Sequence, residues 1–261
     1  MLGFLKRRRR RKLKRQSFPT EWQTIVEHTC PHWAGLSASE KIELQGHVQV
    51  FLAEKNFEGC GGVEITDEMR VTIAATACLL LLGRKTDYFP RMMSVLVYPT
   101  EFVSEIRQVE PGGIVTETEQ ERLGESWYRG PVVLAWDSVQ RGAANARDGR
   151  NVVLHEFAHQ LDSEDGAVNG APVLDARAAQ AAWANVLGAE YTDLIRRIAA
   201  DDHSDLRDYA ATNPAEFFAV VTEHFFEQPR RLNQRHPELY EQFKTFYRQD
   251  PAARIAGDEL A

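Results

Sequence analysis

The feature that most constrains this chain is the pentapeptide His-Glu-Phe-Ala-His at residues 155–159, which matches the pattern H-E-x-x-H. Apolar residues such as Val153 and Leu161 flank it at helical spacing, which favours a buried helix over a solvated one. Residues four positions apart lie on the same face of a helix, so the two imidazoles can reach one metal ion. The fold must therefore keep a polar helix face inside a largely apolar interior.

This pair of histidines predicts a catalytic zinc site. Neutral imidazole binds Zn²⁺ at about 2.0–2.1 Å, and a tetrahedral site with one open position can be catalytic. Glu156 lies beside the first histidine, close enough to take a proton from water that the ion activates, without binding the ion itself. The alternative interpretation is structural, with two histidines packed on a partly buried helix.

A catalytic zinc ion needs a third protein ligand, and two carboxylates compete for that role. Glu216 follows Asn213 and Pro214, which predict a helix start, so its carboxylate could bind the ion or bond back to Asn213 in a capping box. Asp162 is the other candidate, although a bond from its carboxylate to a ligand histidine suits it better. Glu223 lies two turns beyond Glu216 on an apolar helix and needs a polar partner.

The hydrophobic pattern along the chain predicts an α+β fold. A capping box at residues 37–40 predicts a first helix, and residues 67–82 predict a second one that is buried. Strands are predicted over residues 94–98, 114–115 and 132–136. Later helices are predicted over residues 151–161, 176–186, 214–226 and 237–248, with a helical segment near Leu194. Helices, then strands, then helices are typical of an α+β domain rather than of regular alternation.

The charges divide the chain into a basic leader and an acidic remainder. Nine basic residues lie between Lys6 and Arg15, and the remainder has 22 Lys and Arg against 38 Asp and Glu, a net charge of −16. Such an acidic body does not suit a nucleic-acid groove, so we expect no direct binding of nucleic acid. We expect residues 1–17 to be a disordered, solvated leader. Residues 18–261 should form a single domain, helical to about residue 90 and carrying the sheet and catalytic helices from about residue 91.

The leader and the cysteines also predict which membranes and which redox compartment the protein meets. The leader could make weak contact with a membrane or another polyanion, and the apolar side chains of Leu2, Phe4 and Leu5 could insert into a membrane surface. The chain has three cysteines and no C-x-x-C pair, which predicts inert thiols in a reducing cytoplasm. The longest apolar stretch, residues 71–82, is too short to span a bilayer.

Four segments carry a resemblance to a known family. They are Gly-Pro-Val-Val-Leu-Ala-Trp at 130–136, residues 155–162, Asp-Tyr-Ala-Ala-Thr-Asn-Pro-Ala-Glu-Phe-Phe-Ala at 208–219, and Phe-Tyr-Arg-Gln-Asp-Pro at 246–251. Together they resemble the Mlc titration factor A family of bacterial cytoplasmic zinc metallopeptidases. The resemblance implies one Zn²⁺ per chain held by His155, His159 and Glu216, with Glu156 as the catalytic acid and base.

The resemblance also implies a fold and an oxyanion donor. Around its zinc the family is similar to the catalytic domain of anthrax lethal factor, which implies a zincin-like domain with helices flanking a small mixed sheet. There a tyrosine seven residues before the ligand glutamate donates to the developing oxyanion, and Tyr209 stands seven residues before Glu216. Some members place a histidine near the metal upstream of the Gly-Pro strand. Here residues 108–111 contain none, and Glu110 is the carboxylate that could replace it.

Two functions follow as expectations. The first is a zinc peptidase, an aminopeptidase or a peptidase of another specificity, whose substrate is held in extended form along residues 132–136 by main-chain hydrogen bonds. That segment could instead be an ordinary internal strand. The second function, implied by the resemblance, is regulation of glucose uptake by binding the transcriptional repressor Mlc. The alternative to an enzyme is therefore a non-catalytic regulatory protein that sequesters a repressor.

Overall fold

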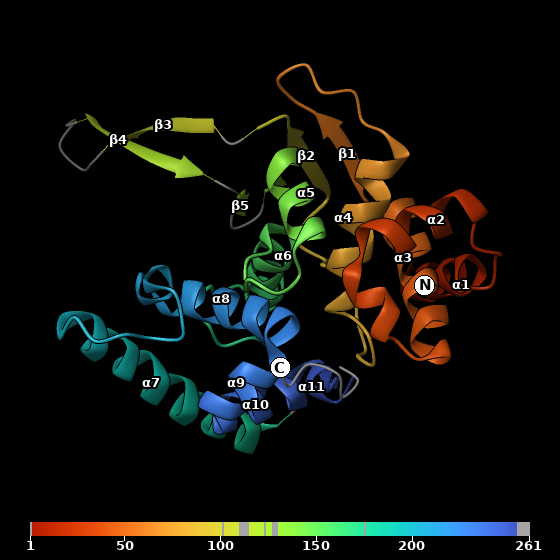
Figure 1. The fold of residues 1–261 in the computed structure, drawn as a ribbon. Coiled ribbons are helices and arrows are strands. Elements are labelled where there is room, and N and C mark those ends of the chain that lie inside the picture. The colour runs from red at the N-terminus through yellow and green to blue at the C-terminus, as the bar shows by residue number, and fades with distance from the viewer. Residues whose placement is uncertain are drawn as a thin grey trace.

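The computed structural model describes residues 2–100, 102–109, 115–122, 124–126, 130–174 and 176–254, with side chains for 3–100, 130–174 and 176–254. Helices pack against a small four-stranded sheet, and a two-stranded pair lies apart from it (Figure 1). The α-helices are α1 Leu2–Leu13, α2 Thr20–Thr29, α3 Ala38–Glu54, α4 Asp67–Leu79, α5 Trp136–Ala144, α6 Val152–Asp162, α7 Arg177–Ala199, α8 Pro214–Glu227, α9 Pro229–Arg235, α10 Pro237–Tyr247 and α11 Pro251–Arg254. The 3₁₀ helices are η1 Pro31–Gly35, η2 Ser163–Asp165 and η3 Asp208–Ala211.

The sheet is small and mixed, as predicted. Its strand order is β1-β2-β6-β5, where the first three strands are parallel and β5 is antiparallel to β6. The strands are β1 Asn56–Gly59, β2 Ser94–Tyr98, β5 Gly124–Ser126 and β6 Val132–Ala135. A separate antiparallel pair, β3 Phe102–Val109 and β4 Val115–Arg122, extends away from the sheet (Figure 1). The α+β class is therefore confirmed.

Strand β6 is internal, which corrects the expectation that residues 132–136 form the free edge for a substrate. Val132 pairs with Val95 of β2 on one side and with Ser126 of β5 on the other. All four residues of β6 are buried, as a strand covered on both faces must be. The next residue, Trp136, begins α5 instead of extending the strand.

Residues 2–13, which the sequence predicted to be a disordered leader, form the docked helix α1. Helix α1 packs against α3, and the Arg10 side chain on its inner face is 10 % exposed. The Arg10 guanidinium donates two bonds to Glu54, at 2.8 and 2.7 Å, and a third to Asp87. Arginine and lysine are good helix formers, and this bidentate pair fixes the helix to the body.

The predicted helix starts agree with the structure more closely than the predicted ends. The Ser37 capping box forms at the start of α3, and α4 begins at Asp67 and continues as buried turns to Leu82. The two helical segments predicted near residues 176–186 and Leu194 are one continuous helix, α7. Helices α1, α2, α5, α9 and α11 and strands β1, β3 and β5 had no counterpart in the sequence prediction.

Two aromatic clusters hold helix α6 and helix α8 in place. Phe157 of α6 contacts Phe51 of α3 and Phe89, with ring centroids 5.7 and 4.8 Å away. On α8, Phe218 packs against Trp183 of α7 and Phe243 of α10, at 5.8 and 5.6 Å. Helix α8 therefore lies between α6 and the pair α7 and α10 (Figure 1). Within the part of the chain that the structure describes, every helix is too short or too polar to cross a bilayer.

Candidate metal and catalytic site

Helix α6 supplies the two histidines. Asn151 caps the helix, and its side chain accepts a bond from the Leu154 backbone N–H at 3.1 Å. The opposite face of α6 carries the buried Leu154 and Phe157 side chains, which anchor the helix in the core. As expected from their spacing, His155 and His159 lie on one face, with ring centroids 4.9 Å apart.

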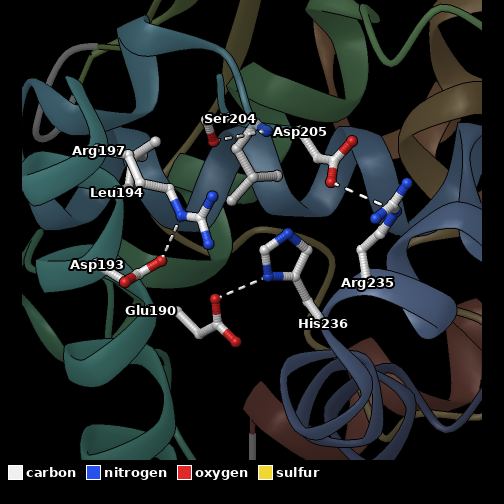
Figure 2. A pocket seen from close by; sticks show the side chains of 9 residues that line it. Glu190, Asp193, Leu194, Arg197, Ser204, Asp205, Arg235 and His236 are labelled. Atoms are coloured by element: carbon white, nitrogen blue, oxygen red, sulfur yellow. Dashed lines mark hydrogen bonds and ion pairs between the residues drawn. The ribbon is translucent and has the colours of Figure 1, made fainter. Parts of the chain in front are cut away.

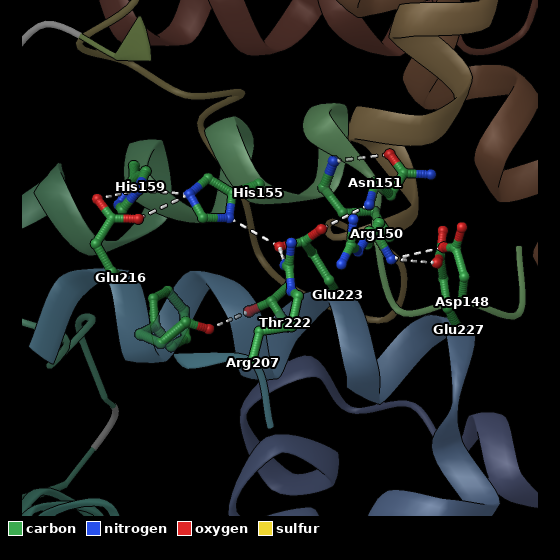
Figure 3. Close-up of polar contacts among 12 residues, drawn as sticks. Asp148, Arg150, Asn151, His155, His159, Arg207, Glu216, Thr222, Glu223 and Glu227 are labelled. Carbon is green, nitrogen blue, oxygen red and sulfur yellow. Dashed lines mark hydrogen bonds and ion pairs between the residues drawn. The ribbon is translucent and has the colours of Figure 1, made fainter. Parts of the chain in front are cut away.

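Helix α8 supplies the carboxylate. Asn213 caps this helix by accepting bonds from the backbone N–H groups of Ala215 and Glu216, at 2.9 and 3.0 Å. The Glu216 side chain contacts the two histidines, with its Oε2 2.9 Å from His155 Nε2 and its Oε1 3.4 Å from His159 Nε2. Of the two roles open to Glu216, the geometry therefore favours the ligand over the capping acid (Figure 3).

These three side chains form what we call the ligand cluster: His155, His159 and Glu216. Their ligand atoms lie within 4.8 Å of one another, and the two Nε2 atoms are 3.2 Å apart. Ligand atoms around a tetrahedral ion bound at about 2.0–2.1 Å lie about 3.3 Å from each other. Two imidazoles and one carboxylate at this spacing fit Zn²⁺. Among the described residues, no other group of three histidine, cysteine or acidic side chains converges in this way.

The electrostatics of the ligand cluster favour a cation. Burial acts to lower the pKa of His155, but its bonds to Glu216 and Glu223 outweigh burial and raise it. Burial acts to raise the pKa of Glu216, but the two histidines outweigh it and lower that pKa. Positive charge is therefore stabilised at the point where the three side chains meet.

Glu156 lies beside the cluster without joining it. Its side chain is 3 % exposed, and its Oε2 is buried with no hydrogen-bond partner. Burial is the main cause that raises the pKa of this carboxyl. A buried carboxylate with a free oxygen next to a metal site can accept and return a proton. This arrangement is compatible with the predicted general base.

Glu223 connects the cluster to the rest of the fold. Its Oε1 accepts a bond from His155 Nδ1 at 2.8 Å, and its Oε2 accepts one from the Asn151 backbone N–H at 2.6 Å. Arg207 forms an ion pair with the same carboxylate. Such a carboxylate fixes the tautomer and orientation of a ligand histidine (Figure 3). The sequence indicated only that Glu223 needs a partner, because the partner's identity depends on how α6 and α8 pack.

Asp162 does not make the bond that was predicted for it. Its Oδ2 accepts a bond from the Gly170 backbone N–H at 2.8 Å, while its Oδ1 and the Nδ1 of His159 are both buried without a partner. Gly170 has φ +74°, and a Cβ there would come within 2.2 Å of the Pro214 carbonyl oxygen. Asp162 thus holds this loop against the start of α8 and is not part of the ligand cluster. Glu110, the other carboxylate considered, lies outside the described residues.

Tyr209 on η3 lies at the open side of the site. The residue is 54 % exposed, and its ring centroid is 6.0 Å from that of His155. The pKa of Tyr209 is raised, because its hydroxyl is partly desolvated and lies beside the Glu216 carboxylate. A hydroxyl that stays protonated can serve as a hydrogen-bond donor. The predicted tyrosine is therefore adjacent to the ligand cluster.

A cavity of about 160 Å³ lies elsewhere, between α7 and α9 (Figure 2). None of the predicted site residues lines it. Its charged groups are paired with one another, as in Arg197 with Asp193 and His236 with Glu190. The geometry of the ligand cluster, and not this cavity, therefore identifies the candidate site.

The chain is similar to several known bacterial proteins. The chain is 40% identical over 246 residues to an uncharacterized protein of Synechocystis sp., covering 93% of this chain and 89% of that protein. It is 34% identical over 227 residues to Mlc titration factor A of Klebsiella pneumoniae, covering 86% and 84%. It is also 34% identical over 237 residues to Mlc titration factor A of Pectobacterium atrosepticum, covering 90% and 88%.

The family resemblance predicted from the sequence is confirmed by these relatives. The family described as glucose-regulated metallo-peptidase M90 matches residues 4–248, a range that contains the whole ligand cluster. The chain therefore belongs to the glucose-regulated metallo-peptidase M90 family.

Proposed function

We propose that this protein is a zinc-dependent peptidase with a zincin-like catalytic domain. The observation that carries the proposal is the convergence of His155, His159 and Glu216 next to a buried Glu156 with an unpartnered carboxylate oxygen. Two imidazoles and a carboxylate are the donor set of many catalytic zinc sites. Tyr209, the exposed member of the group, would lie beside the ion that these residues hold.

Each residue would have a separate role in peptide hydrolysis. Zn²⁺ bound by the ligand cluster would polarise the scissile carbonyl and make water more acidic. The free Oε2 of Glu156 would take the proton of the attacking water and then deliver it to the leaving amine. The Tyr209 hydroxyl would donate a hydrogen bond to the oxyanion as it forms.

The sheet suggests how a peptide substrate would be held. β5 is one of the two terminal strands in the order β1-β2-β6-β5, and it contacts α6, the helix that carries the histidines. Among the described strands, β5 pairs only with β6. An extended peptide can add to such an edge through main-chain hydrogen bonds. We therefore assign the substrate edge to β5 in place of β6.

A second function, regulation through the repressor Mlc, is supported by the relatives named Mlc titration factor A. In this view the protein binds the repressor and so influences glucose uptake. Binding does not exclude catalysis, because a partner surface and the ligand cluster can be separate. The three free cysteines, two of them buried, suit a reducing compartment, and we place both activities in the cytoplasm.

The test compares Glu156→Gln with the wild type for zinc content, peptide turnover and repressor affinity. The amide cannot accept the proton of water, so we expect turnover to fall by about 10²–10⁴-fold while zinc stays bound. Glu68→Gln, the same change at an exposed position on α4, serves as the matched control and should behave as the wild type.

The possible outcomes separate the two functions. Wild-type turnover in Glu156→Gln would contradict the peptidase mechanism. Loss of turnover with zinc and repressor affinity intact would support a catalytic site that is independent of the binding surface. A wild-type protein that binds the repressor, contains zinc and hydrolyses no peptide would favour the non-catalytic regulator.

A further inference from the structure

The basic helix α1 has two chemically different faces. On the inner face, Arg10 pairs with Glu54 and Asp87, and its guanidinium lies 4.5 Å from the ring centroid of Tyr88. Lys6 reaches the same Asp87 at 3.0 Å. These contacts involve two of the nine basic residues, and they fix the rotation of the helix about its own axis. The outer face is thereby held away from the body.

The outer face is cationic and unpaired. Arg8 and Lys12 lie one turn apart, with Arg11 beside them and Arg15 just beyond the helix, and all four side chains are exposed. Within the described part of the chain, none of them makes a hydrogen bond or an ion pair. Four positive charges on one rigid surface repel one another, and no carboxylate among the described residues pairs with them.

The first turn of the same face is apolar. Phe4 is 64 % exposed and Leu5 is 55 % exposed, which makes them two of the most exposed large hydrophobic side chains described. Helical spacing places both within the half-turn that contains Arg8 and Lys12. An apolar end next to a cationic stripe is typical of helices that lie on an anionic bilayer surface.

We propose that α1 docks this protein on the surface of a bilayer containing anionic phospholipid. Arg8, Arg11, Lys12 and Arg15 would contact the lipid phosphates, while Phe4 and Leu5 would enter the interface. Basic side chains and inserted apolar groups together give a stable but reversible attachment, whereas either one alone binds weakly. The ion pairs of Arg10 set the orientation, so the helix is presented before any lipid is bound.

The alternative polyanion, nucleic acid, fits the surface less well. A phosphate backbone would engage the four basic side chains but would leave Phe4 and Leu5 in water. The remainder of the chain, at −16, would also repel a long duplex that extends past the helix. A lipid bilayer would contact both the basic and the apolar side chains of this face, whereas nucleic acid would contact only the basic ones.

The experiment measures co-sedimentation of the full-length protein with vesicles of phosphatidylglycerol and phosphatidylcholine in equal parts, and with pure phosphatidylcholine. We expect binding only to the anionic vesicles, and we expect added salt to weaken it. Each basic side chain at an anionic surface contributes about fivefold, so Arg8→Ser/Lys12→Ser should bind about 30-fold more weakly. Phe4→Ser/Leu5→Ser should bind about tenfold more weakly at low and high salt alike.

The matched control removes two positive charges from another helix. Arg177 and Arg196 are exposed on α7, which lies far from α1 in Figure 1, and Arg177→Ser/Arg196→Ser should bind as the wild type does. An equal loss of vesicle binding in this control would show that binding depends only on net charge, and it would overturn the proposal. Equal binding of wild type to both vesicle types would do the same. Tighter binding to duplex DNA that depends on Arg8 and Lys12 but not on Phe4 and Leu5 would identify nucleic acid as the partner instead.

Discussion

Histidine and glutamate side chains occur at both ends of helix α8, but their favoured protonation states are opposite. At its start, Glu216 meets His155 and His159, and contact between them favours the charged form of both His155 and Glu216. At its end, His224 and Glu227 form what we call the distal cluster. There burial lowers the pKa of His224 to about 4 and raises that of Glu227 to about 8, so both neutral forms are favoured.

The difference lies in which atoms converge. In the ligand cluster, three ligand atoms from two helices point at one position. In the distal cluster, His224 Nε2 and Glu227 Oε1 are each buried without a partner, and Glu227 Oε2 accepts a bond from the Arg150 backbone N–H at 2.9 Å. Gly149, with φ +73°, lets the loop approach His224, where a Cβ would lie 3.0 Å from the ring. Histidine and glutamate therefore form a cation site only where packing directs them together.

Replacing one histidine at each end is the most severe test of this comparison. His155→Ala removes one of three ligands, and the two that remain cannot hold the ion well, so zinc and activity should disappear together. His224→Ala removes a neutral side chain from the distal cluster and should keep one zinc per chain. Metal analysis of both variants, purified without chelator, provides the measurement. Zinc loss in His224→Ala alone would reverse our assignment of the two clusters.

Tyr209→Phe tests whether the exposed side of the ligand cluster takes part in chemistry. Removing one oxyanion donor should lower kcat by about 10²–10³-fold, with zinc content unchanged. Tyr191→Phe, which removes the hydroxyl that donates to the Ala211 carbonyl at 3.0 Å, is the matched control and should leave kcat nearly intact. Equal kcat values for Tyr209→Phe and the wild type would assign Tyr209 a packing role only.

Glu223→Gln and Asp162→Asn compare two buried carboxylates near the histidines. Glu223 contacts His155 directly, so the amide should weaken zinc affinity by roughly 10–100-fold. Asp162 bonds to Gly170 instead, so Asp162→Asn should lower the free energy of unfolding while leaving zinc affinity within about threefold of the wild-type value. Competition with a chelator measures both affinities. A larger loss of affinity in Asp162→Asn would restore the role that its sequence position suggested.

The smallest effect concerns the distal cluster and pH. The folded-state pKa of Glu227 is raised to about 8, so its stabilising contribution is complete below its ordinary pKa and is lost as the pH rises through about 8. Wild type should therefore be less stable at pH 9 than at pH 6. Glu227→Gln has no proton to lose and should be more stable than wild type at pH 9 by roughly 1–2 kcal/mol, and similar to it at pH 5. Urea unfolding at the three pH values checks this, and parallel curves would show that the carboxyl titrates normally.

Local signals in the sequence were sufficient for most helix starts and for the histidine pair. Asn151, Asn213 and Ser37 were recognised as helix starts, and each accepts backbone bonds in the structure. The orientation of α1 could not be foreseen, because the partners of Arg10 lie 44 and 77 residues away. Strand β6 was misassigned as an edge, because a short apolar run does not reveal how many neighbours it has.

The sequence by itself determined that two imidazoles share a helix face beside a glutamate, since helical periodicity alone places His155 and His159 together. It also limited the third ligand to a few carboxylates. Only the tertiary structure decided among them, because the choice depends on the packing of α6 against α8. That packing places the Glu216 carboxylate in contact with the imidazoles and the His155 Nδ1 in contact with Glu223. The Asp162 carboxylate instead accepts a bond from the Gly170 backbone N–H. A chain encodes spacing locally, whereas convergence of side chains 61 or 68 residues apart exists only after the core has formed.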